Sequence, residues 1–295
     1  MRLVVTGGSS FVGAHFCKVA ARTHDVHALF HSCPVRLNRV TGHRVDLRRP
    51  RDADRIRALR PDAVVHLACR IKAPAKDGLS ASEAAARINR QMMDSVLSLG
   101  VPIVYASSTV VHWSTPTPYG ASRLEDEQRI RESGLPYAIL RPSAPYGPAL
   151  PHHRPRHRES FHTLARLVRH APFVPVLGSG HQRRQPIHVD DFADAIVRLL
   201  AQPLPDRAFE AGGGSAHSMR ELIAIMGHTI GRRPLVVPLP TALFVQAARL
   251  MPDFDPALMA AASEDEVADP TELSAHTGWA PRTFEEGARE LMEGC

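Results

Sequence analysis

Tyr119 and Arg123 lie four positions apart, and their side chains have the clearest capacity for chemistry in this chain. On a helix, that spacing places both side chains on one face. Ser108 precedes them at the end of an apolar run. A serine hydroxyl can position a carbonyl or carbinol oxygen, a tyrosine can give or take its proton, and a cation lowers the pKa of the phenol from about 10. These three residues therefore predict proton transfer at an alcohol or a ketone.

A second motif lies near the N-terminus, where residues 6–13 read TGGSSFVG between a predicted strand and a predicted helix. A turn of this kind holds the pyrophosphate of a dinucleotide at a helix N-terminus, where free N–H groups and the helix dipole favour anions. Gly7 permits the tight turn, and Gly13 lets the helix lie close to the strand. Ser10 stands where glycine is usual, but its hydroxyl can cap the helix and donate to a phosphate. Position and context favour a dinucleotide site over an ordinary strand–helix turn.

The residues after the second predicted strand bear on the choice of cofactor. An NAD site usually has Asp or Glu there to bind the 2′-hydroxyl of the adenosine ribose. This chain has Phe30 and His31 instead, and Arg36 and Arg39 follow. Because a missing acid with nearby cations suits a 2′-phosphate, the sequence favours NADP, with NAD as the alternative cofactor. A solvated basic loop is the alternative interpretation of the two arginines.

These residues need a scaffold that brings strand ends together. Apolar runs typical of buried strands alternate with helical patterns through the first two-thirds of the chain. The predicted helices begin at residue 11, at Ser80 (ending at Leu99) and at Tyr119. The predicted strands span residues 2–7, 25–30, 62–68, 102–108 and 137–143, with a weak strand closing at Asp46 and Leu47. This alternation predicts a parallel sheet with helices on both faces.

The predicted fold class is therefore α/β, a Rossmann-type doubly wound parallel sheet with a smaller mixed C-terminal substrate-binding lobe. We expect residues 1–145 to form the dinucleotide-binding domain and residues 184–214 to return to it. Residues 146–183 and 215–295 are expected to form the lobe.

The composition restricts the class of protein. The chain has 295 residues, 44% of them hydrophobic, and a net charge of +6. No apolar run is long enough to span a bilayer, no secretory signal opens the chain and the four cysteines are scattered. We therefore expect a cytoplasmic protein with neither a disulfide framework nor a metal site. The arginines are spread along the chain, so we expect a phosphate-bearing small molecule as partner and no nucleic acid, although DNA binding is an alternative.

The run 152–158, HHRPRHR, is the most basic segment. A solvated loop is the first interpretation and a phosphate contact the second. Metal binding through His152, His153 and His157 is the third, because no carboxylate or cysteine completes a ligand set.

With HLAC closing the fourth strand, these motifs together resemble the extended short-chain dehydrogenase/reductases. Within them the chain is most similar to the NAD-dependent epimerase/dehydratase family, typified by UDP-glucose 4-epimerase. The family's SSxxVYG appears as SSTVVHW, its YxxxK as YGASR and its RPxNxYGP as RPSAPYGP, and its TGxxGxxG falls on 6–13. The resemblance covers nearly the whole chain, and the joint order of the motifs is far more specific than any one of them. A Tyr–Arg pair that only stabilises a helix leaves these motifs unexplained.

The resemblance implies roles for further residues. It implies that the cofactor, besides the residues already named, contacts Phe11, Val12, Asp46, Leu47, Leu67, Ala68, Cys69, Asn89, Tyr119, Arg123 and Ser143. It implies that the substrate contacts Ser108, Tyr146 and Arg184, the last as an arginine that grips the pyrophosphate of a nucleotide. It also implies a homodimer formed through the helix ending near Leu99 and the helix bearing Tyr119.

Arg123 departs from the family pattern, in which a lysine bonds the nicotinamide ribose and lowers the pKa of the tyrosine. Arginine keeps the charge but is longer and planar. Three interpretations remain open: a working catalyst with arginine standing in, altered or slowed chemistry, and a catalytically silent NAD(P)-binding regulator.

The neighbours of Ser108 narrow the reaction. Family dehydratases carry an acidic pair there, whereas this chain has Ser107, Thr109 and Val110, so dehydration is disfavoured. Hydride transfer at a secondary hydroxyl or ketone remains, either as epimerisation or as net reduction. Arg184 implies a nucleotide sugar, but EVADPTEL occupies the region of a second family arginine. The alternative is an NADPH-dependent ketone reductase acting on a non-sugar substrate.

Overall fold

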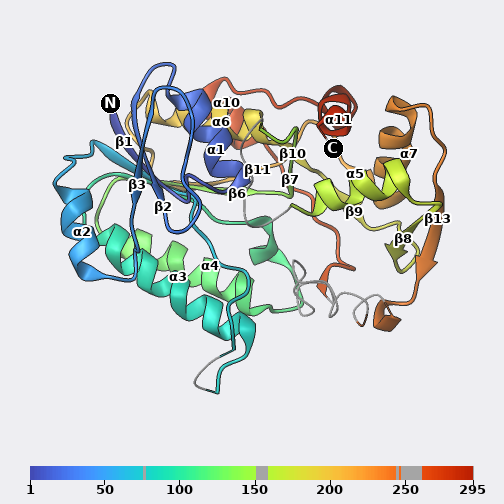
Figure 1. The fold of residues 1–295 in the computed structure, drawn as a ribbon, viewed down its shortest axis with the longest axis horizontal. Coiled ribbons are helices and arrows are strands. Elements are labelled where there is room, and N and C mark those ends of the chain that lie inside the picture. Colours follow the sequence, from blue (N-terminus) through green and yellow to red (C-terminus); the bar gives the residue numbers. More distant parts are fainter. Residues whose placement is uncertain (76–77, 151–158, 244–245, 247–260, 295) are drawn as a thin grey trace.

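The computed structural model describes residues 1–75, 78–150, 159–243, 246 and 261–294. Its centre is a sheet of seven parallel strands in the order β11-β6-β5-β4-β1-β2-β3 (Figure 1). The strands are β1 (Arg2–Thr6), β2 (Asp25–Phe30), β3 (Val40–Arg44), β4 (Ala63–His66), β5 (Ile103–Ala106), β6 (Tyr137–Pro142) and β11 (Arg207–Ala211). The strand order reverses between β1 and β4, so the predicted doubly wound parallel sheet is confirmed.

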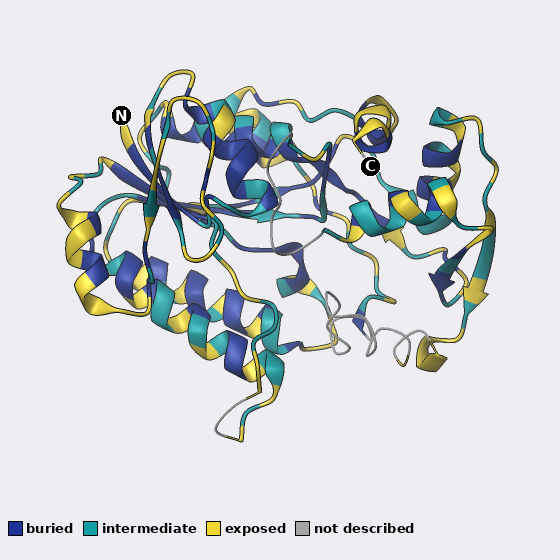
Figure 2. Ribbon diagram, in the orientation of Figure 1, coloured by how far each residue is buried: buried dark blue, intermediate teal, exposed yellow. Residues whose placement is uncertain are grey.

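Helices cover both faces of the sheet (Figure 1). Leu3 and Val5 of β1 pack with the helices on one face, whereas Val4 packs with those on the other, as the period of a strand requires. The helices of the first face are α1 (Phe11–Ala20), α6 (Val189–Leu200) and α10 (Thr271–Thr277). Those of the second are α2 (Pro50–Arg57), α3 (Ala81–Leu97) and α4 (Pro118–Glu132). The inner strands β1, β4 and β5 are largely buried between these layers (Figure 2), whereas the edge strand β3 has no buried residue.

A smaller lobe has its own apolar core, to which Phe161, Leu222 and Phe284 contribute. Its elements are α5 (Ser160–His170), α7 (Met219–Thr229), α11 (Phe284–Glu293) and the parallel pair β8 (Phe173–Leu177) and β13 (Leu235–Leu239). Short strands connect it to the sheet, namely β7 (Pro145–Tyr146), β9 (Arg183–Arg184), β10 (Ile187–His188) and β12 (His217–Ser218). Leu273 and Trp279 pack in the core of the large sheet, so part of the C-terminal segment lies outside this lobe.

Local signals explain where the site-bearing helices begin. Thr117 accepts a hydrogen bond from the N–H of Gly120 (3.0 Å), and Pro118 follows at the first helical position, so α4 starts one residue before Tyr119. Ser80 and Glu83 form a capping box that starts α3, which ends at Leu97 instead of Leu99. β3 likewise ends at Arg44, short of the predicted Asp46, because the N–H of Asp46 donates to the Asp52 carboxylate instead of a strand (2.8 Å).

Among the described residues, no helix is both long enough and apolar enough to cross a membrane. Nor do three or more His, Cys, Asp or Glu side chains converge there as metal ligands. The basic run 152–158 lies outside the described residues.

Candidate active site

Ser108, Tyr119 and Arg123 converge at the carboxyl edge of the sheet. Ser108 follows β5 and caps the 3₁₀ helix η1 (Thr109–His112), where its Oγ accepts a hydrogen bond from the N–H of Val110 (3.3 Å). Tyr119 is in the first turn of α4, close enough to Ser108 for the serine hydroxyl to lower the pKa of the phenol. The guanidinium carbon of Arg123, one turn further along α4, lies 5.5 Å from the centroid of the Tyr119 ring. The structure thus brings together the three residues that the sequence singled out.

The surroundings of Tyr119 act on its acidity in both directions. Burial of the phenol raises the pKa of Tyr119, and so does the thiol of Cys69 when ionised. The Arg123 cation and the Ser108 hydroxyl oppose this rise, because both stabilise the phenolate. Desolvation has the larger effect, so the tyrosine is held in its protonated form at neutral pH.

Arg123 is buried, with 1% of its surface exposed. Its Nη2 lies 3.3 Å from Oδ2 of Asp126, which is also buried and accepts a hydrogen bond from the Tyr105 hydroxyl (2.9 Å). Nε and Nη2 of Arg123 have no hydrogen-bond acceptor among the described residues. A buried donor without an acceptor is costly, so these atoms are suited to a polar ligand group placed beside Tyr119.

The glycine turn has the close approaches that a dinucleotide site requires. Gly7 has φ +68°, and a Cβ there would lie 2.8 Å from the backbone of Ala68. A Cβ on Gly13 would lie 2.1 Å from the carbonyl oxygen of Gly7, so only glycine lets α1 sit this close to the turn. Ser10 is the N-cap of α1 and accepts a hydrogen bond from the N–H of Gly13 (3.0 Å). The glycine turn and the N–H groups of Arg123 that have no acceptor among the described residues both fit a bound NAD(P).

Two side chains hold the segment that follows β4. Asn89 was predicted to contact the cofactor, and Thr6 had no predicted role. Thr6 Oγ1 accepts hydrogen bonds from the N–H groups of Leu67 (3.1 Å) and Ala68 (3.0 Å). Asn89 exchanges two hydrogen bonds with the backbone of Arg70, at 2.8 and 2.9 Å, and is 1% exposed. Asn89 therefore shapes the segment that carries Cys69, where the nearby Tyr119 hydroxyl acts to lower the pKa of the thiol.

A basic cleft of about 450 Å³ opens beside the ends of β2 and β3. It is lined by His31, Arg44, Val45, Asp46, Arg49, Arg51, Asp52 and Arg55. Arg48 holds Asp46 with two hydrogen bonds (2.8 and 2.7 Å), which lower the pKa of Asp46 to about 2, so the carboxylate is ionised. Arg36 and Arg39 are exposed and do not line this cleft.

Four predicted ligand contacts have buried side chains in the structure. Tyr146, predicted to contact the substrate, is fully buried between Phe161 and Phe284 in the lobe core. The others, predicted as cofactor contacts, are Phe11, Leu47 and Ser143. Phe11 packs against histidine rings, Leu47 lies in the core, and the Ser143 hydroxyl donates to the carbonyl of Gln185. Only the backbone of these three residues could contact a cofactor. Val12 is half-buried and packs against the core on the α1 face of the sheet.

Arg184 is enclosed by the C-terminal segment. It donates hydrogen bonds to the carbonyls of Ala262 and Glu264, and its Nε lies 3.7 Å from Oε2 of Glu266. Glu266 in turn accepts a hydrogen bond from Thr109, the residue after Ser108 (2.8 Å). Burial lowers the pKa of Arg184 and raises that of Glu266. The guanidinium of Arg184, which was predicted to bind a pyrophosphate, therefore contacts a carboxylate and backbone oxygens of its own chain.

Sequence reasoning missed two carboxylates of this region, Asp126 and Glu266. Asp126 is three positions after Arg123, a spacing that places the two residues on one helix face and could have identified it. Glu266 comes from 157 positions after Thr109, and nothing local in the sequence connects the two.

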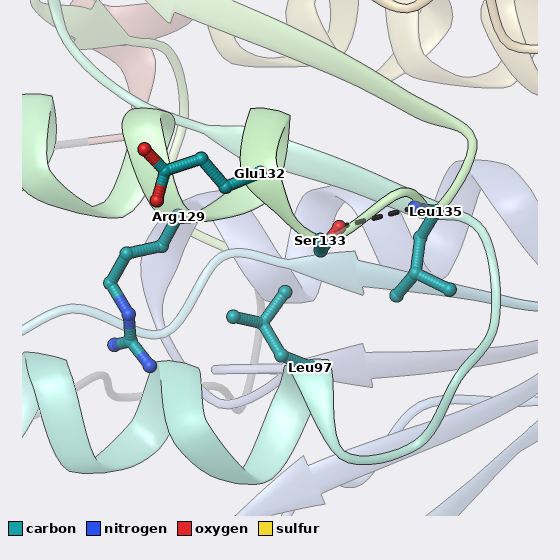
Figure 3. A pocket seen from close by; sticks show the side chains of 5 residues that line it. All are labelled: Leu97, Arg129, Glu132, Ser133 and Leu135. Atoms are coloured by element: carbon teal, nitrogen blue, oxygen red, sulfur yellow. Dashed lines mark hydrogen bonds between the residues drawn. The ribbon is translucent and has the colours of Figure 1, made fainter.

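A second cavity, of about 370 Å³, lies between the C-terminal ends of α3 and α4 (Figure 3). It is lined by Leu97, Arg129, Glu132, Ser133 and Leu135. In Figure 3 the only dashed contact among these residues joins the Ser133 hydroxyl to the N–H of Leu135 (3.2 Å). The cavity is at the opposite end of α4 from Tyr119 and shares no residue with the Ser108 cluster.

Comparisons with known proteins find a matching family and similar proteins. The NAD dependent epimerase/dehydratase family matches residues 3–212. A ceramide reductase of Caulobacter vibrioides is 26% identical over 264 residues, which are 84% of this chain and 77% of that protein. A 2′-dehydrokanamycin reductase of Streptomyces kanamyceticus is 31% identical over 256 residues, 81% of this chain and 70% of that protein.

Solved structures share the fold. The UDP-glucose 4-epimerase of Thermus thermophilus, in complex with NAD, aligns with a TM-score of 0.77 and 24% identity over 100% of this chain and 98% of its own.

Proposed function

The chain belongs to the NAD-dependent epimerase/dehydratase family, as its motifs predicted, and we propose that it transfers a hydride at a secondary hydroxyl or ketone. The observation that carries the proposal is the buried Arg123 cation 5.5 Å from the Tyr119 ring, at a place where the Ser108 hydroxyl also lowers the pKa of the phenol. NAD(P) supplies or accepts the hydride when bound. The protein residues bind and orient the substrate oxygen and move its proton.

Each residue has one task in the reduction of a ketone. The Ser108 Oγ already accepts from Val110, so its proton is available to donate to the carbonyl oxygen. Tyr119 gives its proton to the same oxygen as the carbonyl carbon receives the hydride, and an alcohol and a tyrosinate result. The Arg123 cation stabilises that tyrosinate until it is reprotonated from solvent. A phenol held protonated at neutral pH suits this direction.

We propose net reduction of a ketone that carries no nucleotide, which was the alternative to a nucleotide sugar in the sequence analysis. The support is the enclosure of Arg184 by Glu266, Ala262 and Glu264. A pyrophosphate would have to displace the Glu266 carboxylate and would be repelled by it. The two relatives compared above by sequence are both named reductases, whereas the solved structure compared above is a UDP-glucose 4-epimerase that shares the fold. Epimerisation of a nucleotide sugar is the second candidate, and it requires Arg184 to leave these partners.

A substrate survey tests this proposal. Purified protein with NADPH is supplied with a panel of non-nucleotide ketones, with and without UDP, and separately with UDP-sugars. We expect NADPH consumption with at least one ketone and no inhibition by UDP. Interconversion of UDP-sugars, or competition by UDP, would support the epimerase instead. Cofactor binding without turnover in either panel would support the silent regulator.

We propose NADP as the preferred cofactor. Its support is the basic cleft, where Arg44, Arg49, Arg51 and Arg55 outnumber Asp46 and Asp52. A 2′-phosphate brought to the end of β2 would meet these cations, and bidentate arginine contacts suit phosphate. Arg49 replaces Arg36 as the arginine we expect to contact it, because Arg36 lies outside the cleft.

Replacing Arg49 with glutamine should weaken NADPH binding about tenfold and leave NADH binding nearly unchanged, since only NADPH has the phosphate. Arg49 is half exposed and makes no side-chain cap for α2, so the exchange should not disturb the fold. Arg36→Gln is the matched control and should change neither affinity. Fluorescence titration measures both, and tighter binding of NADH than NADPH by the wild-type protein would refute the preference.

We also propose a homodimer formed through α3 and α4. Leu124 supports it, because this apolar side chain is 45% exposed on α4. Leu124→Glu should therefore shift a wild-type dimer to monomer, while Leu235→Glu, an exchange at an exposed leucine of β13, should not. Sedimentation at micromolar concentration distinguishes the two species, and a monomeric wild-type protein would contradict the proposal.

A further inference from the structure

Arg123 lies between two tyrosine rings and one carboxylate. Its guanidinium carbon is 5.3 Å from the centroid of Tyr105 and 5.5 Å from that of Tyr119. Asp126 reaches the same guanidinium from one turn further along α4, with 3.3 Å between Oδ2 and Nη2. Both charged side chains are nearly inaccessible, at 1% and 2% exposure.

We propose that Asp126 is a positioning residue for the active site, which acts through Arg123 by offsetting part of its charge so that Tyr119 remains a proton donor at neutral pH. This inference rests on the proposed role of Tyr119 as the acid. It assigns a chemical task to a carboxylate that touches neither Tyr119 nor the Ser108 hydroxyl.

The physical reason is the position of the pair in a poorly solvated interior. Charges there are screened less than in water, so Tyr119 responds to the sum of the Arg123 and Asp126 charges. Burial raises the pKa of Asp126, but the Arg123 cation and the hydrogen bond from Tyr105 oppose that rise. The Tyr105 hydroxyl also fixes the carboxylate in place, since it donates to Oδ2 at 2.9 Å.

Other groups near the pair contribute less charge. His66 of β4 stacks on Tyr105, and burial lowers its pKa to about 3, so it is neutral. Its Nδ1 lies 2.7 Å from Thr6 Oγ1, which already accepts two N–H groups and therefore donates to this nitrogen. Desolvation raises the pKa of the Cys69 thiol, which is accordingly neutral too.

Among the described residues, Glu159, the N-cap residue of α5, is a further titratable group that acts on Tyr119. Burial raises its pKa to about 7, so its charge changes near neutral pH. Any measurement of the ionisation of Tyr119 must therefore include a Glu159→Gln background, in which this second titration is absent.

The isosteric exchange Asp126→Asn tests the proposal. It removes the negative charge but leaves an oxygen that can still accept from Tyr105. With the cation no longer offset, the phenolate is favoured and the pKa of Tyr119 falls. The rate of alcohol oxidation, which needs the phenolate, should then begin to rise about one pH unit earlier than in the wild type. In Arg123→Met, the rate of alcohol oxidation should begin to rise at a higher pH than in the wild type.

Asp126→Glu keeps the charge and should restore the wild-type profile. A tyrosinate absorbance titration, taken as the difference between each protein and its Tyr119→Phe derivative, gives the same shift without any turnover. It therefore tests Asp126 even if the proposed reaction is wrong. Should Asp126→Asn not fold, Asp126→Ser removes the same charge with a smaller side chain.

In Asp126→Asn or Asp126→Ser, we expect both the rise in the rate of alcohol oxidation and the tyrosinate absorbance to begin at a lower pH than in the wild type. In Asp126→Glu we expect neither shift. An unchanged or later ionisation of Tyr119 in a folded neutral variant would overturn the proposal and leave Asp126 a structural partner of Arg123.

Discussion

Tyr119→Phe should lower kcat by at least about 100-fold, a loss of about 2.7 kcal/mol of transition-state stabilisation. The phenylalanine ring still packs in the first turn of α4, and only the ionisable oxygen is lost. Cofactor affinity should be nearly unchanged, because the glycine turn and Arg123 are intact. Steady-state kinetics and a fluorescence titration with NADPH measure the two quantities on the same preparation.

Tyr137→Phe is the matched control for this exchange. Tyr137 opens β6, whereas Ser108 lies after the end of the neighbouring strand β5, so the two residues are at opposite edges of the sheet. The control should keep full activity. An unimpaired Tyr119→Phe variant of an active wild-type protein would reject the mechanism.

Arg123→Met should have the second largest effect. Without the cation that favours the phenolate, the pKa of Tyr119 rises, and the kinetic pKa of alcohol oxidation should move upward by about one unit or more. Cofactor affinity should also fall, because the orphaned Nε and Nη2 donors are lost. The free energy of unfolding should fall by up to about 3–5 kcal/mol, since Asp126 is left buried without its partner.

Arg123→Lys restores a compact cation at the same position and should retain much of the activity. A pocket formed around a planar guanidinium leaves the shorter ammonium incompletely bonded, so some loss is expected. pH–rate profiles of both variants and thermal unfolding curves check these results. If Arg123→Met, Arg123→Lys and Tyr119→Phe all turned over like the wild type and differed only in stability, the Tyr–Arg pair would be structural.

The sequence predicted the sheet and the grouping of Ser108, Tyr119 and Arg123 because both depend on local patterns. The alternation of apolar runs and helical segments determines a parallel sheet, and parallel strands end at one edge. The sequence placed Ser108 and Tyr119 together because Ser108 follows strand β5 at that edge and Tyr119 lies in the first turn of the next helix, α4. Gly7 and Gly13 could be identified because their spacing matches the turn that a close helix requires.

The surroundings that the sequence could not predict depend on long-range packing. Tyr146 is enclosed by helices from later in the chain, among them α11. Arg184 is paired with Glu266, which lies 82 positions later in the chain. In the sequence, Asp126 is one of several acidic residues in the run LEDEQ, which suggests an exposed side chain. Only the packing of α4 shows that it is buried.

Transfer of deuterium from NADPH labelled at the nicotinamide C4 to a ketone tests the central claim most directly. The product alcohol is analysed by mass spectrometry after incubation with the wild-type protein, Tyr119→Phe and Tyr137→Phe. The wild type and the Tyr137 variant should place one deuterium on the carbinol carbon, while the Tyr119 variant should yield almost no labelled alcohol. Equal labelling by all three proteins, or none by the wild type with any ketone of the panel, would contradict the account.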